Sequence, residues 1–107
     1  MALTRNFKIT VAARVQSDPV FAQALLDEAI KLFINGEPET AKLILRDLVN
    51  ASVGFEKLAL EIHKPAKSLH RMLSENGNPR LDSFIAIVDA LQKETRVKLE
   101  VNVRQLD

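Results

Sequence analysis

The sequence lacks cysteine, tryptophan and tyrosine, and its 107 residues include only three glycines, four prolines and two histidines. Without cysteine the chain forms neither disulfides nor thiolate zinc sites. No apolar run approaches about 18 residues, which argues against a membrane span. The first residues lack the apolar core of a signal peptide, so we expect a cytoplasmic protein. With 47% apolar and 27% charged residues, the composition is typical of one small folded domain.

The two histidines offer little to catalysis or metal binding. His63 and His70 are separated by Pro65, and no carboxylate stands beside them at ligand spacing. Ser68 and His70 are two positions apart, so they do not face each other on a helix, and no third residue orients the histidine. The sequence therefore predicts no catalytic residue, no metal site and no cofactor, and it favours a binding protein over an enzyme.

Prolines and glycines divide the chain into short segments. Proline suits the first turn of a helix and glycine suits the position just past its end, and Asp18 before Pro19 is an expected N-cap. Between these markers apolar residues recur at helical spacing. The ranges predicted to be helical are 5–16, 19–35, 38–53, 55–62, a segment from Pro65 to near Glu75, and 81–92. The apolar stripes of the early helices are interpreted as core, with a groove for a partner as the alternative.

The spacing changes from helical to alternating near the C-terminus. Over residues 97–104 apolar and polar residues alternate strictly, and the apolar positions are Val97, Leu99, Val101 and Val103. A period of two with β-branched residues predicts a half-buried β-strand. Because a lone strand leaves its backbone groups unpaired, we expect it to pair with a second copy of the chain or with a different protein. A weakly ordered tail is the alternative.

Positive charge is concentrated in one stretch, although the net charge of the chain is only +1. Between His63 and Arg80 there are four lysines and arginines against one acidic residue, Glu75. A short positive patch on an otherwise neutral chain indicates one contact site for an anionic partner.

The helix predicted after Pro65 has two different faces. One arc of its helical wheel is apolar and holds Ala66, Leu69, Met72 and Leu73. The opposite arc holds Lys67, Ser68, His70, Arg71 and Ser74. A helix of this width fits the major groove of DNA, where lysine and arginine favour guanine and other polar groups contact bases or phosphates. An ordinary solvent-exposed face is the alternative.

The two short segments on either side of Pro65, joined by about three residues, form a helix-turn-helix arrangement. The motif residues are Leu58-Ala59, Ile62, Leu69 and the turn Asn76-Gly77-Asn78-Pro79-x-Leu81. They resemble the helix-turn-helix domain of the Cro and lambda-repressor family over roughly residues 38–91. Over nearly its whole length the chain looks like a HigA-type antitoxin of the probable addiction-module antidote group. That likeness rests on GEPETA at 36–41, LRDLVNA at 45–51 and KSLHRML at 67–73.

The expected fold is mainly α, with five to six short helices, a lambda-repressor-like helix-turn-helix and one C-terminal β-strand pairing across a dimer. The expected parts are an N-terminal helical extension (1–37), the helix-turn-helix domain (38–94) and a C-terminal segment for dimerisation or partner binding (95–107). The resemblance implies a homodimeric repressor that binds operator DNA in its own promoter. It also implies that the protein neutralises a RelE/ParE-like toxin by direct binding.

The resemblance places the base-reading positions on Ala66, Lys67 and Ser68, with His70 and Arg71 following. Three flanking residues are expected at phosphates: Lys64, Asn78 and Arg80. Phe55 departs from the family pattern, which often has a polar DNA contact there, and His63 stands where glycine is common. The alternative function is a protein-interaction module, or a prophage regulator, with a helix-turn-helix scaffold and no toxin partner.

Overall fold

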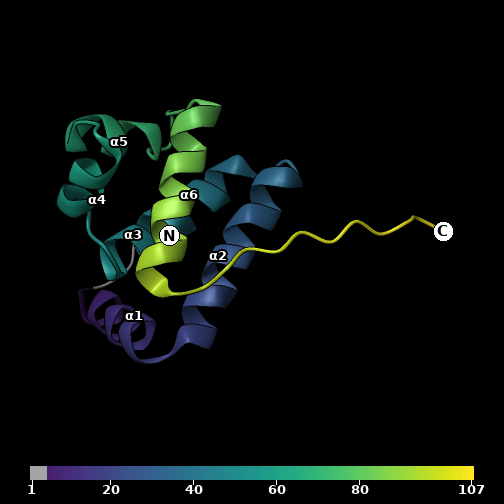
Figure 1. Cartoon of the computed structure of the whole chain (residues 1–107), viewed down its shortest axis with the longest axis horizontal. Helices are drawn as coiled ribbons and strands as arrows, with labels where there is room; N and C mark the ends of the chain where they lie inside the picture. The colour runs from purple at the N-terminus through teal and green to yellow at the C-terminus, as the bar shows by residue number, and fades with distance from the viewer. Residues whose placement is uncertain (1–4) are drawn as a thin grey trace.

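The computed structural model describes the backbone of residues 5–107 and the side chains of residues 11–107. Over the described residues the chain is mainly helical, as predicted, and Figure 1 shows how its six helices are arranged. Their bounds are α1 Arg5–Ser17, α2 Pro19–Ile34, α3 Pro38–Ala51, α4 Phe55–Ile62, α5 Ala66–Met72 and α6 Leu81–Thr95. None of these helices has the length and apolar composition needed to cross a membrane.

The start and end of α2 show how the predicted markers act. The Asp18 carboxylate accepts a hydrogen bond from the Val20 amide at 3.1 Å, and Pro19 occupies the first turn. The predicted N-cap is therefore confirmed. After the helix, Gly36 has a φ of 84°, a left-handed conformation that glycine adopts without the steric cost of a Cβ.

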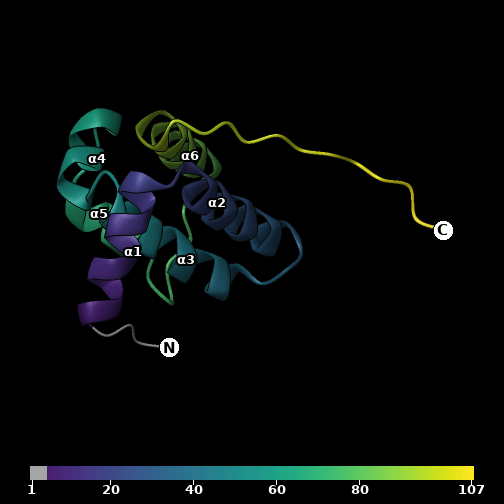
Figure 2. The same ribbon diagram turned by 90° about the horizontal axis from the view of Figure 1, so that it is seen from below.

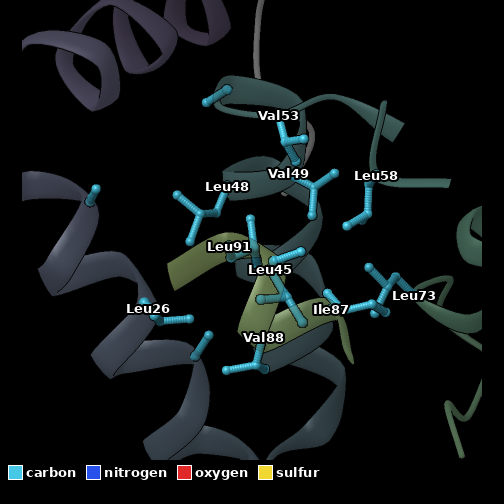
Figure 3. Close-up of a cluster of buried hydrophobic side chains, with 14 of the residues drawn as sticks. Leu26, Leu45, Leu48, Val49, Val53, Leu58, Leu73, Ile87, Val88 and Leu91 are labelled. Carbon is cyan, nitrogen blue, oxygen red and sulfur yellow. The ribbon is translucent and has the colours of Figure 1, made fainter. Parts of the chain in front are cut away.

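One hydrophobic core connects the helices (Figure 3). It brings together Leu26 of α2, Leu45, Leu48 and Val49 of α3, Leu58 of α4, and Ile87 and Leu91 of α6. At one end of α2, Phe33 meets Phe84 of α6 edge to face, with 4.8 Å between ring centroids. The core is continuous across residue 37, so α1 and α2 pack with the later helices as one unit.

The buried stripe of α2 is shifted from the one that its large side chains indicate. Its fully buried positions include Ala22, Leu26 and Ala29, whereas Phe21 and Leu25 lie partly buried at the edge. Small alanine side chains allow α2 to approach α3 closely, and these two helices form the most extensive contact in the fold. The apolar stripes of the early helices are therefore part of the core, as predicted.

Ser83, in the first turn of α6, is buried without a hydrogen-bond partner for its hydroxyl. An unpaired buried hydroxyl costs free energy, and alanine is also the better helix former. We expect Ser83→Ala to raise the free energy of unfolding by about 1 kcal/mol, measured by urea denaturation. Exposed Ser17→Ala is the matched control, and a loss of stability in Ser83→Ala alone would show that the hydroxyl is satisfied in solution.

The C-terminal segment 97–107 leaves the domain on the side opposite α4 and α5 (Figures 1 and 2). It is extended, but it has no strand partner within the described chain, so the predicted β-pairing stays a prediction. Val97 and Leu99 are partly buried against the core, whereas Val101 and Val103 are exposed. The four residues predicted for dimerisation therefore fall into two pairs with different surroundings.

Candidate nucleic-acid interface

Helices α4 and α5 are joined by three residues that reverse the chain sharply. His63 ends α4 in the left-handed conformation, with a φ of 57°, and the Lys64 amide donates to the Ala59 carbonyl at 3.1 Å. Pro65, at a φ of −63°, then leads into α5. The left-handed backbone at His63 explains why this position suits glycine.

Burial divides α5 into the two faces that its helical wheel predicts. Leu69 is fully buried, and Leu73 just after the helix is nearly so, because both insert into the core beside α4. Lys67, His70 and Arg71 are exposed on the opposite side. Of the other predicted base-reading residues, Ala66 and Ser68 are half-buried. Packing therefore fixes which side of α5 a partner can reach.

The two cations of α5 have no ion-pair partner among the residues whose side chains are described. By contrast, Lys57 on α4 lies 4.0 Å from the Glu61 carboxylate and 3.3 Å from that of Glu94. Lys31 and Lys93 likewise form ion pairs, each with an aspartate four residues earlier in its helix. Lys67 and Arg71 therefore present uncompensated positive charge one helical turn apart on an exposed face.

His70 stacks on Phe55 of α4, with 4.0 Å between ring centroids and 22° between the ring planes. Phe55 is 5% exposed, so its side chain belongs to the core and not to the surface. Phe55 therefore serves the packing of α4 on α5, which accounts for an apolar residue at this position. The stack gives His70 a structural role in addition to its predicted contact with DNA.

The predicted flanking residues lie on both sides of α5. Lys64 is half-buried in the turn before it, and Asn78 and Arg80 are exposed in the connection to α6. The Arg80 guanidinium lies 3.6 Å from the Asp82 carboxylate, and both side chains are exposed. A surface ion pair of this kind contributes little to stability, so Arg80 can exchange Asp82 for a phosphate at small cost.

The sequence prediction was wrong about the end of α5, which stops at Met72 and not near Glu75. After the helix, the Ser74 hydroxyl and amide both donate to the Arg71 carbonyl, at 2.7 and 3.2 Å. The chain then turns back across the end of α5 through Gly77, which is buried. Contacts from this turn, and not helix propensity, set the length of α5.

Lys42 of α3 holds this turn in place, and sequence reasoning did not identify it. Its ammonium group is buried, with the residue 4% exposed, and donates to the carbonyl oxygens of Glu75 at 3.0 Å and Gly77 at 2.5 Å. A buried charge requires such hydrogen bonds. The signal was available, because Lys42 falls on the same wheel arc as Leu45 and Val49, where a charged residue is out of place.

Replacing Lys42 with methionine removes the ammonium group and keeps much of the apolar stem. We expect the free energy of unfolding to fall by about 2 kcal/mol, because hydrogen bonds to a charged donor are lost and two carbonyl groups lose their partner. Guanidinium denaturation measures this change. Lys31→Met, at an exposed lysine, is the matched control, and equal effects of the two substitutions would contradict the role of Lys42.

Among the residues whose side chains are described, no three histidine, aspartate or glutamate side chains gather at distances that could hold a metal ion. The exposed face of α5 that carries Lys67 and Arg71 is therefore the clearest candidate for a binding site. Comparison of the chain with models of protein families, with curated proteins and with solved structures found no match.

Proposed function

We propose that this chain is a sequence-specific DNA-binding repressor in which α4, the turn and α5 form a helix-turn-helix. The observation that carries the proposal is the pair of unpaired cations, Lys67 and Arg71, on the exposed face of α5 opposite the buried Leu69. Two cations on one rigid face suit the guanine edges and phosphates of a major groove. This arrangement favours a nucleic acid over a neutral partner.

In this proposal α5 is the recognition helix. Lys67 and Arg71 read bases, and Ser68 and Ala66 lie near the start of the helix, where base contacts concentrate in this type of motif. Lys64, Asn78 and Arg80 flank α5 on both sides, as expected of residues that hold phosphates and fix the orientation of the protein. A dimer would bind a palindromic operator with half-sites about 34–36 Å apart, or at a multiple of that spacing.

We further propose that the protein is an antitoxin that represses its own operon and binds a RelE/ParE-like toxin. This part rests on the sequence resemblance over residues 36–73. Co-expression with the product of the neighbouring gene tests it. Growth rescue together with co-purification of the two proteins is expected, and toxicity that the chain does not relieve would leave a repressor without a toxin.

The DNA part is tested by fluorescence anisotropy with the duplex just upstream of the gene, at two salt concentrations. We expect tight binding that weakens steeply with salt, because each phosphate neutralised by lysine or arginine releases counterions. An unrelated duplex of equal length is the control. Equal affinity for both duplexes would contradict a sequence-specific repressor.

The alternative is a protein-interaction module with a helix-turn-helix scaffold. It is favoured by the net charge of only +1 and by the burial of Phe55, which removes one family DNA contact. Absence of any salt-dependent binding to DNA would favour this alternative, because a protein that binds only other proteins releases no DNA counterions.

The proposal includes a homodimer that pairs through the C-terminal segment. We expect deletion of residues 97–107 to give a monomer with weaker operator binding, because each chain then binds one half-site without its partner. Deletion of residues 101–107 alone keeps the partly buried Val97 and Leu99 and should have the same effect on assembly without exposing the core. Light scattering that shows an intact dimer in both variants would contradict this role.

A further inference from the structure

The first half of the C-terminal segment is anchored to the domain by Gln92. The Val97 amide donates to the Gln92 backbone carbonyl at 3.1 Å, and the Leu99 amide donates to the Gln92 side-chain oxygen at 2.7 Å. The side chains of Val97 and Leu99 are partly buried against the core. The segment therefore leaves α6 in a fixed direction, and it crosses α2 on its way out (Figures 1 and 2).

Within the described part of the chain, the backbone of the opposite edge of this segment has no hydrogen-bond partner. In an extended chain, successive residues direct their N–H and C=O groups to opposite sides, so the amides of the even positions point away from Gln92. Lys98, Glu100 and Asn102 border, together with Val97 and Leu99, a groove whose other wall is α2, including Val20 and Ala24. Val101 and Val103 do not line this groove and are 69% and 96% exposed, although they continue the alternation of Val97 and Leu99. The open edge, the groove and the two valines together form an unoccupied seat for one more strand.

We infer that the C-terminal segment of a second copy of the chain occupies this seat, antiparallel, with the two-fold axis at Asn102. The inference rests on the proposed dimer and specifies its contact. Antiparallel pairing places residues whose numbers sum to 204 opposite each other, so Glu100 faces the partner's Arg104 and Val101 faces the partner's Val103. The valines of the two chains then cover one another on a single face.

Side-chain alternation and space restrict the choice of axis. An axis on a residue matches apolar with apolar positions, whereas an axis between residues sets valine against charged side chains. Leu99 lies next to α2 and packs against the core, so in the paired strands both copies of α2 would lie on the same face, each near its own Leu99. An axis at Leu99 or Glu100 would bring these helices within about 5–8 Å, which is less than their width of about 10 Å. An axis at Asn102 separates the two Leu99 positions by roughly 20 Å.

Charge selects between the registers that remain. With the axis at Val101, Lys98 would face the partner's Arg104, and the symmetry would repeat this repulsion. With the axis at Asn102, Glu100 faces the partner's Arg104 twice, and Lys98 faces the partner's Leu106. Opposite charges across a strand pair stabilise it and like charges destabilise it. With the axis at Val103, Glu100 would face the partner's Leu106 and form no such pair, and with the axis at Arg104 the two arginines would face each other. The geometry and the charges therefore agree on Asn102.

Single-cysteine variants test the register, because the natural chain has no cysteine. At the axis the two Cα atoms are about 5.5 Å apart, within disulfide range, so Asn102→Cys should form a covalent dimer under mild oxidation. In Val101→Cys and in Val103→Cys the two cysteines of the dimer would be diagonal neighbours about 7–8 Å apart. These variants should therefore form little covalent dimer. Exposed Asn50→Cys is the matched control for random collisions. A maximum at another tail position, or equal yields at every position, would overturn the inference.

Charge-reversal substitutions test the register a second time, without introducing cysteine. Glu100→Arg and Arg104→Glu should each raise the dimer Kd about tenfold, since two symmetry-related pairs become repulsive. The double variant should restore it. Lys98→Glu, facing a leucine, is the control with little expected effect. Sedimentation velocity measures all four, and a double variant as weak as the singles would overturn the register.

These results separate the inference from the proposed function. Wild-type protein that sediments as a dimer and binds its operator, with no crosslink in the tail, would overturn the seat and leave the repressor standing. A crosslink at Asn102→Cys in a protein that ignores the upstream duplex would overturn the repressor and support the seat.

Discussion

Replacing Lys67 and Arg71 together with alanine is expected to eliminate specific binding to the upstream duplex. Each side chain that contacts a base typically contributes about 1–3 kcal/mol, so each single substitution should weaken binding about fivefold to 150-fold. Both side chains are exposed and form no ion pair among the described residues, so nothing in the fold depends on their charge. Fluorescence anisotropy at one fixed salt concentration measures the affinity, and thermal unfolding should be unchanged.

The control for this prediction is the removal of an equal charge elsewhere. Lys31 of α2 is also exposed, and it pairs with Asp27 at 2.8 Å. The double variant Lys31→Ala/Lys93→Ala removes two positive charges far from α5 in sequence. If it weakens DNA binding as much as the Lys67→Ala/Arg71→Ala variant, the affinity reflects overall charge and α5 is not the recognition helix.

The positions of the helices could be predicted because their determinants are local. Proline in the first turn, a cap such as Asp18 and a glycine just past the end all act within a few residues. The exposed face of α5 was predictable for the same reason, since Leu69 and Lys67 differ in polarity and the helical period assigns them to opposite sides. These features require no knowledge of the tertiary fold.

The features that sequence reasoning missed depend on contacts between different elements of the fold. Lys42 of α3 reaches Gly77 across 35 positions, and Gln92 of α6 anchors Leu99 of the C-terminal segment seven positions later. No periodicity encodes such contacts, because a lysine or a glutamine is compatible with either an exposed or a buried site until its neighbours are known. The short α5 has the same cause, since the turn that ends it is held by α3.

The C-terminal segment combines both situations. Its alternation correctly indicates an extended backbone with one apolar side, and Val97 and Leu99 do turn that side toward the core. After Glu100 the same pattern continues without a surface to cover it, because Val101 and Val103 are not among the residues that line the groove with α2. Because the apolar alternation continues past the surface of its own domain, we assign the exposed Val101 and Val103 to a contact with a second copy of the chain.

Replacing Gly77 with alanine is expected to lower the free energy of unfolding by about 3 kcal/mol, near the upper end of the common range for single substitutions. A Cβ at this position would overlap the carbonyl oxygen of Arg71 and lie 2.8 Å from that of Met72. Both are backbone atoms at the end of α5, so no side chain can move aside. Either the last turn of α5 unwinds, or the connection to α6 shifts away.

Urea denaturation of Gly77→Ala and Gly36→Ala separates this overlap from the general cost of replacing glycine. Gly36 has a positive φ, but a Cβ there meets nothing within 4 Å, so its replacement should cost only about 1–2 kcal/mol of backbone strain. A Gly77→Ala cost no larger than that of Gly36→Ala would show that the turn yields easily. If the cost is larger, the overlap has forced the turn to shift and has pulled the Gly77 carbonyl away from the Lys42 ammonium. The decrease in the free energy of unfolding would then exceed the cost of the steric overlap alone, and the folded fraction would bind DNA more weakly because α5 has lost the turn that fixes its end.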